Sequence, residues 1–124
     1  MDLGEAIIVD RLDSVEMRPS SQPVYDREIE LGDLYTDPGS GAEHYVVRYP
    51  AGLRARPHRH TAGHTIVVLE GRLVVNDQVV GPGGYCHLPG GQPMFHGPAG
   101  REPCRFLIMF DGPFDVEPLG DEWS

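Results

Sequence analysis

The sequence predicts an all-β domain built as a barrel or a sandwich, and three observations support this fold class. Sixteen glycines and twelve prolines interrupt a chain of 124 residues, which leaves little room for helices of ordinary length. No window sustains an apolar repeat with a period of 3.6 residues. Short runs of β-branched and aromatic residues instead recur between turn-forming residues, which is typical of sandwiches and barrels.

The predicted strands are apolar segments bounded by Gly, Pro, Asn or Asp. Asn76 and Asp77 are predicted to form the turn of a hairpin, because this residue pair suits the tight turn between two short strands. In chain order the predicted strands are residues 24–31, 44–49, 64–69, 73–75 with 79–80, 85–88 and 104–110.

Two of these strands are apolar on both faces, around residues 65–69 and 106–110. A half-exposed strand alternates apolar and polar residues, so these two strands require cover on their outer faces. The terminal arms of the same chain or a second subunit can supply that cover. We expect a homodimer.

The domain organisation predicted for residues 1–124 is a single domain, since a chain of this length can bury a sufficient core. Residues 23–111 are expected to form the barrel. Residues 1–22 form an N-terminal arm and residues 112–124 an acidic C-terminal tail, which wrap the barrel or contact a partner chain.

Charge and composition exclude several functions. The formal net charge is -9, which disfavours nucleic acid and anionic membranes as partners. All basic residues are arginine, so lysine-dependent chemistry such as Schiff-base formation is excluded.

Apolar runs stay near five residues, too short for a membrane span or a signal-peptide core, and a cytoplasmic location is expected. Cys86 and Cys104 are then expected to be reduced and to serve as small apolar residues.

A cluster of histidines predicts a metal site. His58, His60 and His64 fall within seven residues, and His96 follows a glycine-rich turn. Imidazole is the commonest protein ligand of transition metals. The alternative interpretation is a polar surface loop.

The spacing of these histidines fits strands better than a helix. Residues two apart on a strand share a face about 7 Å apart, so His58 and His60 can converge on one ion. His64 then opens the next strand with its side chain pointing inward. A helical pairing of His60 with His64 is disfavoured by Pro57 and Gly63.

Two stretches resemble the motifs of the cupin family. Residues 52–71 match the first motif, which is a glycine, five residues, His-x-His, three residues, an acid, six residues and a glycine; only the acid differs. Residues 83–96 resemble the second motif, which is a glycine, five residues, Pro-x-Gly and then a histidine. The resemblance implies a single-domain cupin, a double-stranded β-helix or jelly-roll barrel.

Two departures from the family pattern concern the ligands. His64 stands where most cupins carry glutamate, so the site is all-imidazole, similar to the three-histidine sites of some cupin dioxygenases. The gap after Gly91 is two residues longer, so Met94 takes the strict ligand position and His96 lies two residues beyond. His96 is preferred because a thioether is a poor ligand for a hard divalent ion.

The resulting prediction is one divalent transition metal, Fe, Zn, Ni or Mn, held by His58, His60, His64 and His96. Residues expected in the pocket or around the ligands are Met94, His44, His87, Tyr49 and Arg56. Histidines in or beside strands, such as His44 and His87, are more often core or interface residues than metal ligands.

Function follows from the charge of this site. No Asp or Glu lies between Glu43 and Glu70 or between Asp77 and Glu102, so four neutral imidazoles leave the charge of the ion uncompensated. A small anionic molecule is the expected ligand, assisted by arginines of the stretch 48–59.

The first functional hypothesis is a metal-dependent dioxygenase that resembles the cupins cleaving diketones or hydroxy-ketones, with a small anionic or enolisable ketone as substrate. The second is a non-catalytic zinc-binding sensor or ligand-binding cupin, because the chain also resembles the cupin domain of zinc-binding anti-sigma factors. The third is a dimer with a purely structural metal.

Overall fold

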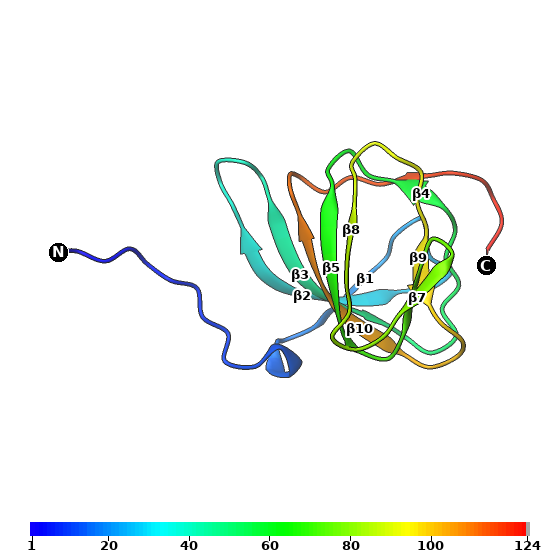
Figure 1. Ribbon diagram of the computed structural model, residues 1–124, viewed down its shortest axis with the longest axis horizontal. Coiled ribbons are helices and arrows are strands. Elements are labelled where there is room, and N and C mark those ends of the chain that lie inside the picture. Colours follow the sequence, from blue (N-terminus) through cyan, green and yellow to red (C-terminus); the bar gives the residue numbers. More distant parts are fainter. Residues whose placement is uncertain (124) are drawn as a thin grey trace.

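The computed structural model describes residues 1–123 and forms a barrel of short antiparallel strands (Figure 1). The final residue of the expected tail, Ser124, lies outside the described residues. No helix among residues 1–123 is long and apolar enough to cross a membrane. The elements are η1 (Leu12–Ser14), β1 (Arg18–Ser20), β2 (Ile29–Thr36), β3 (Glu43–Tyr49), β4 (His58–Arg59), β5 (His64–Glu70), β6 (Leu73–Val75), β7 (Gln78–Val80), β8 (Tyr85–Leu88), β9 (His96–Pro98), β10 (Cys104–Phe110) and β11 (Glu117–Pro118).

The strands form one large sheet and two small ones. The large sheet has the order β1-β2-β3-β10-β5-β8, and the small sheets are β7-β6-β9 and β11-β4. Every pairing is antiparallel. In Figure 1 the small sheets lie across the barrel from β5 and β8. The predicted all-β jelly-roll barrel is confirmed.

Most predicted strands coincide with observed ones. The hairpin turn at Asn76 and Asp77 is confirmed, since Val75 pairs with Gln78 and Asn76 adopts a φ of 53°. The predicted strand 24–31 is wrong in its first half, because β2 begins only at Ile29. Asp26 instead turns toward the loop at Arg54, with the Asp26 amide donating to the Arg54 carbonyl at 3.0 Å.

The inner face of the large sheet forms the core. On β5 and β10 buried and half-buried residues alternate, so that Ile66, Phe106 and Ile108 point inward. Tyr49 and Leu73 complete the centre of this core and are fully buried. Each such side chain contributes about 1.5–3 kcal/mol when it is removed from water.

The N-terminal arm covers part of the outer face of the large sheet. Val46 points outward yet is fully buried, and its neighbour across the sheet is Gly32. A Cβ at Gly32 would lie 2.5 Å from Val15 Cγ1 and 2.8 Å from Met17 Sδ. The arm therefore lies directly on the sheet at a position where only glycine leaves room.

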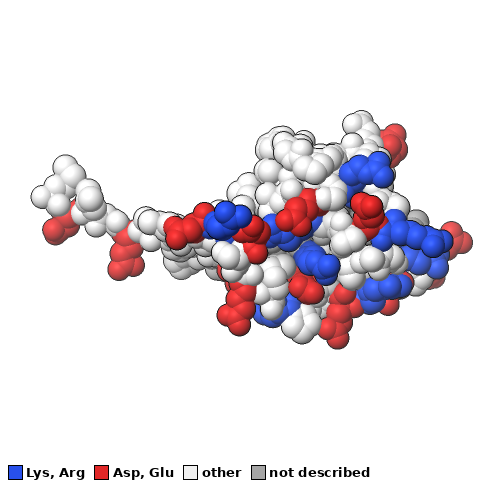
Figure 2. Space-filling model, turned by 90° about the horizontal axis from the view of Figure 1, so that it is seen from below, with Lys and Arg blue, Asp and Glu red and all other residues white. Residues whose placement is uncertain are grey.

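The first residues of the arm lie away from the barrel, as Figures 1 and 2 show. Ile7 and Ile8 are 65% and 78% exposed. Val67, Leu107 and Met109, on the outer face of β5 and β10, are only half-buried. The arm of a single chain thus leaves part of the apolar outer face accessible, and the expected homodimer stays a prediction.

We expect the paired substitution Ile7→Glu and Ile8→Glu to shift a dimer toward monomer, because charges on the arm oppose its burial against a second copy. Light scattering after size exclusion at micromolar concentration measures the mass. Val79→Glu is the control, since Val79 is also exposed but lies on the distant β7. A monomeric unsubstituted protein would contradict the prediction.

Candidate metal centre

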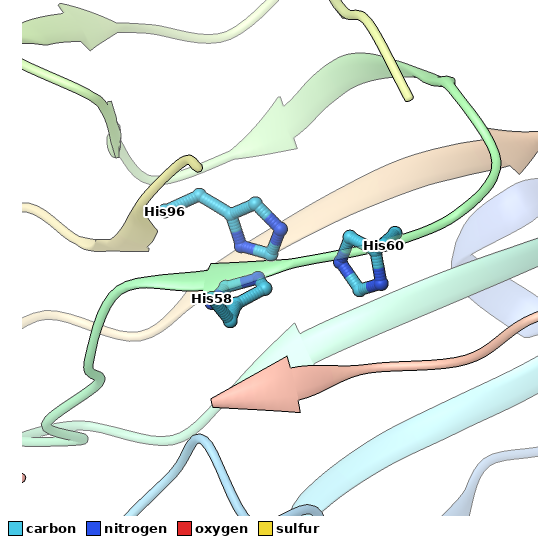
Figure 3. A group of neighbouring side chains, drawn as sticks. All are labelled: His58, His60 and His96. Carbon is cyan, nitrogen blue, oxygen red and sulfur yellow. The ribbon is translucent and has the colours of Figure 1, made fainter. Parts of the chain in front are cut away.

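Four histidines converge inside the barrel. His58 lies on β4 and His60 just beyond it, His64 opens β5, and His96 opens β9. All four are buried, with exposures between 0% and 6%. Figure 3 shows the rings of His58, His60 and His96 around a common space. The surface-loop interpretation of the cluster is therefore wrong.

Three of the histidines form a tight group. One ring nitrogen from each of His58, His60 and His96 lies within 4.8 Å of the others. His64 stands beside this group, with its ring centroid 4.9 Å from that of His60 and 5.7 Å from that of His96. The structure thus brings together all four predicted ligands, and His58, His60 and His96 are the closest set.

The hydrogen bonds of the three grouped histidines leave one nitrogen of each ring free. His58 Nδ1 lies 3.0 Å from the Arg56 carbonyl, His60 Nδ1 lies 2.5 Å from the Asp115 carbonyl, and His96 Nδ1 lies 2.6 Å from the Tyr49 hydroxyl. A carbonyl only accepts hydrogen bonds, so His58 and His60 each carry their proton on Nδ1.

The remaining ring nitrogens have no partner among the described residues. These are Nε2 of all four histidines and also Nδ1 of His64. A buried polar atom without a partner costs about 1–3 kcal/mol. Unpaired, buried imidazole nitrogens that face one another match the donor set of a divalent transition ion, and the residues present therefore fit a metal centre.

Burial keeps these imidazoles neutral. Desolvation lowers the pKa of His58 to about 4 and that of His64 to about 3. Desolvation also lowers the pKa of His60, and the pKa of His96 falls well below its usual value. At neutral pH the free nitrogens consequently present lone pairs, which is the form that binds metal.

A glycine turn holds the two ligand segments together. Gly91 N donates to the His60 carbonyl at 2.8 Å. A Cβ at Gly90 would lie 2.3 Å from the Thr61 carbonyl oxygen and 2.8 Å from Gly63 N. The glycines of the second motif are therefore needed for the close approach of this turn to the turn that joins His60 to His64.

The C-terminal segment supports the site, a role that the sequence did not predict. The Asp115 carboxylate accepts from the backbone amide of Thr61 at 2.7 Å and from its hydroxyl, while the Asp115 carbonyl accepts from His60. The ring of Phe114 lies 5.6 Å from that of His60. β11 pairs with β4, so this segment is a structural part of the barrel.

A cavity of about 210 Å³ adjoins His60 and His96. Its wall is largely apolar and includes Phe106, Ile108 and Phe110 of β10. Among the described residues no Asp or Glu lines it. Two histidines of the cluster, His60 and His96, thus lie next to a space that can hold a small ligand.

Two predicted neighbours of the site are placed elsewhere. His44 points away from the core and packs against Tyr35, with ring centroids 5.5 Å apart. His87 is exposed, and its Nδ1 lies 2.9 Å from Thr65 Oγ1 on the outer face of β5. Their assignment to the pocket or the ligand surroundings is wrong, because alternation along β3 and β8 turns both side chains outward.

The arginine prediction also needs correction. The Arg56 guanidinium donates to the Pro23 carbonyl at 2.7 Å and lies 5.0 Å from the centroid of the Trp123 ring, so only its backbone carbonyl contacts the histidine cluster, at His58. The other arginines of the stretch 48–59 do not line the cavity either. Arg18 lines it instead, while its guanidinium is paired with Asp33 at 2.7 Å.

Tyr49 and Met94 lie beside the candidate ligands as expected. Tyr49 contacts His96 through its hydroxyl. Met94 is buried opposite His58, and each of the two backbone amides donates to the carbonyl of the other residue at 2.9 Å.

A jelly-roll barrel with inward-facing histidines from two motif segments is the architecture of a cupin with a candidate metal centre. The sequence matches the ChrR cupin-like domain over residues 9–115, and the chain belongs to this family. A search of curated proteins found no match.

Solved structures share the fold at low sequence identity. A cupin-like protein from Thermotoga maritima is 21% identical, with a TM-score of 0.75 over 88% of this chain and 90% of that protein. The polyketide cyclase RemF from Streptomyces resistomycificus is 22% identical, with a TM-score of 0.73 over 94% and 88%. An acetylacetone dioxygenase from Acinetobacter johnsonii is 16% identical, with a TM-score of 0.71 over 98% and 82%.

His60→Ala or His96→Ala should abolish stoichiometric metal binding, since each removes one of three grouped nitrogens. Metal analysis by mass spectrometry of purified, untagged protein measures the content per chain. His87→Ala is the control and should retain the metal. If Met94→Ala loses the ion and His96→Ala keeps it, the assignment of His96 as the ligand is wrong.

The metal-free protein should lose stability as the pH falls from about 6.5 toward 4. The folded-state pKa values of His58 and His64 are lowered, whereas unfolded histidines take up protons near pH 6.5. The unfolded state then binds more protons, so the free energy of unfolding decreases with decreasing pH. Urea denaturation of chelator-treated protein at pH 7, 6 and 5 measures this. A constant free energy across that range would contradict the burial argument.

Proposed function

We propose that the protein is a metal-dependent, dioxygenase-like enzyme that acts on a small anionic or enolisable ketone, such as a diketone or hydroxy-ketone. The observation that carries this proposal is the carboxylate-free cavity beside His60 and His96. A purely structural ion needs no space for a ligand next to it, whereas a catalytic ion keeps one position for substrate. The cavity therefore favours an exchangeable ligand.

The histidine cluster would hold the ion through the free nitrogens of His58, His60 and His96, with His64 beside them. A divalent redox-active metal bound there would supply positive charge and electron exchange with oxygen. The neutral imidazoles leave that charge uncompensated, so the site favours an anionic ligand.

The cavity wall determines which groups the ligand can carry besides its anionic end. Phe106, Ile108 and Phe110 exclude water and favour an apolar body of small size. Besides the two histidines, the polar residues of the lining are Arg18, Ser20, Gln22, Tyr25 and Tyr45, of which Arg18 and Tyr45 are paired with Asp33 and Glu43. An enolisable ketone combines an acidic oxygen-bearing end with small alkyl groups and suits this surface.

The shared fold of the acetylacetone dioxygenase from Acinetobacter johnsonii is consistent with this proposal. The polyketide cyclase RemF has a similar barrel, so the fold alone does not select the reaction. The substrate class proposed for this chain rests on its own cavity.

A second candidate is a non-catalytic, zinc-binding cupin that senses or binds a small ligand. The match to the ChrR cupin-like domain favours it. The same cavity and histidines would serve this function, but bound ligand would not be converted. The two candidates differ in turnover and not in binding.

The protein reconstituted with a redox-active metal should consume oxygen in the presence of acetylacetone or 3-hydroxy-2-butanone. Fe, Mn, Ni and Zn are tested in separate preparations. An oxygen electrode measures consumption, and calorimetry measures binding to the same preparations. His60→Ala treated identically is the control and should consume none. Binding without consumption by every metal form would favour the sensor, and neither binding nor consumption would leave a structural ion.

A further inference from the structure

A buried chain of hydrogen bonds joins His96 to the cavity wall. The Tyr49 hydroxyl lies 2.6 Å from His96 Nδ1 and 2.6 Å from the Tyr25 hydroxyl. The two tyrosine rings are in contact, with centroids 5.1 Å apart. Tyr25 and His96 both line the cavity, so the chain starts and ends at the same space.

The first bond of the chain has one direction when His96 binds an ion. A neutral imidazole has one N–H, and a ligand that binds through Nε2 carries its proton on Nδ1. His96 Nδ1 then donates to the Tyr49 oxygen.

The second bond follows from the burial of Tyr49. Its side chain is fully buried, and the partners found for its hydroxyl among the described residues are His96 and Tyr25. Because His96 has no proton acceptor to offer at Nδ1, the Tyr49 hydroxyl donates to the Tyr25 oxygen.

The hydroxyl proton of Tyr25 therefore has no acceptor within this chain of hydrogen bonds. The hydrogen between the two tyrosine oxygens belongs to Tyr49, and the hydroxyl of Tyr25 has no other partner found within residues 1–123. We infer that the Tyr25 hydroxyl is the hydrogen-bond donor that binds an oxygen of the ligand in the cavity, and that Tyr49 orients it in response to the ligation of His96.

This inference rests on the proposed function and narrows its substrate class. The ligand must present an oxygen acceptor to Tyr25 in addition to the oxygen directed toward the histidine cluster. Burial raises the pKa of Tyr25, so its hydroxyl stays protonated and acts as a donor at neutral pH. A dicarbonyl, hydroxy-ketone or carboxylate offers two such oxygens.

Tyr35 provides a matched control outside the cavity. It does not line the wall, and its hydroxyl donates to the Asp37 carboxylate at 2.8 Å. Substitution by phenylalanine removes the same atom from both tyrosines. Only Tyr25 is expected to lose a contact with the ligand.

The test uses the full chain loaded with zinc, which binds ligands without oxygen chemistry. Calorimetry with acetylacetone and with acetate measures the dissociation constants. Tyr25→Phe should weaken binding about 10-fold or more, as expected for a lost hydrogen bond to an anion. Zinc content should stay at the level of the unsubstituted protein, and Tyr35→Phe should bind both probes as the unsubstituted protein does.

Tyr49→Phe tests the positioning role. Without the Tyr49 hydroxyl, Tyr25 is free to turn away from the cavity, so affinity for acetylacetone should fall. The double substitution of Tyr25 and Tyr49 should bind no more weakly than Tyr25→Phe alone, because Tyr49 acts on the ligand through Tyr25. A merely structural effect would add in the double variant.

Equal affinity of Tyr25→Phe and the unsubstituted protein would overturn the inference. An additive loss of affinity in the double variant would also overturn it, and so would the failure of the zinc-loaded protein to bind either probe. Oxygen consumption is read separately. If it is absent while Tyr25→Phe weakens binding, the proposed reaction fails and the inference on Tyr25 stands.

Discussion

The structure depends on keeping four neutral imidazoles buried with ring nitrogens unpaired. Each orphaned nitrogen costs about 1–3 kcal/mol, a large amount against the net stability of a domain this size. The fold reduces this cost by supplying oxygen partners for Nδ1 of His58, His60 and His96. A bound ion would compensate the remainder, so metal binding and barrel stability are coupled.

The partners that meet this constraint come from distant parts of the chain. Arg56 precedes the ligand strand, Tyr49 lies on β3, and Asp115 follows the last strand of the large sheet. Closing the barrel is what brings these three oxygens around one cluster. The ligand geometry is consequently a property of the whole barrel and is not set by the His-x-His segment alone.

The sequence predicted those features that follow from local spacing. Alternation along a strand places His58 and His60 on one face, and the same period relates Met94 to His96, so the histidine cluster could be anticipated. His44 and His87 could not be placed, because β3 and β8 carry apolar residues on both faces and the pattern does not say which face is inner. Tyr25 and Asp115 escaped prediction because no spacing rule relates them to ligands with which they share no local segment.

Charge explains why hydroxyl groups, and not guanidinium groups, set the polarity of the cavity. Arg18, Arg48 and Arg59 are paired with Asp33, Glu30 and Glu117. These pairs are largely exposed, so each contributes at most about 1 kcal/mol to stability, yet each engages a cation that could otherwise bind an anion. The uncompensated positive charge of the site would then reside in the ion, and neutral hydrogen-bond donors on the wall would orient the ligand. A cavity of this kind discriminates by where the oxygens of a ligand lie, and selectivity should therefore follow ligand geometry more than net charge.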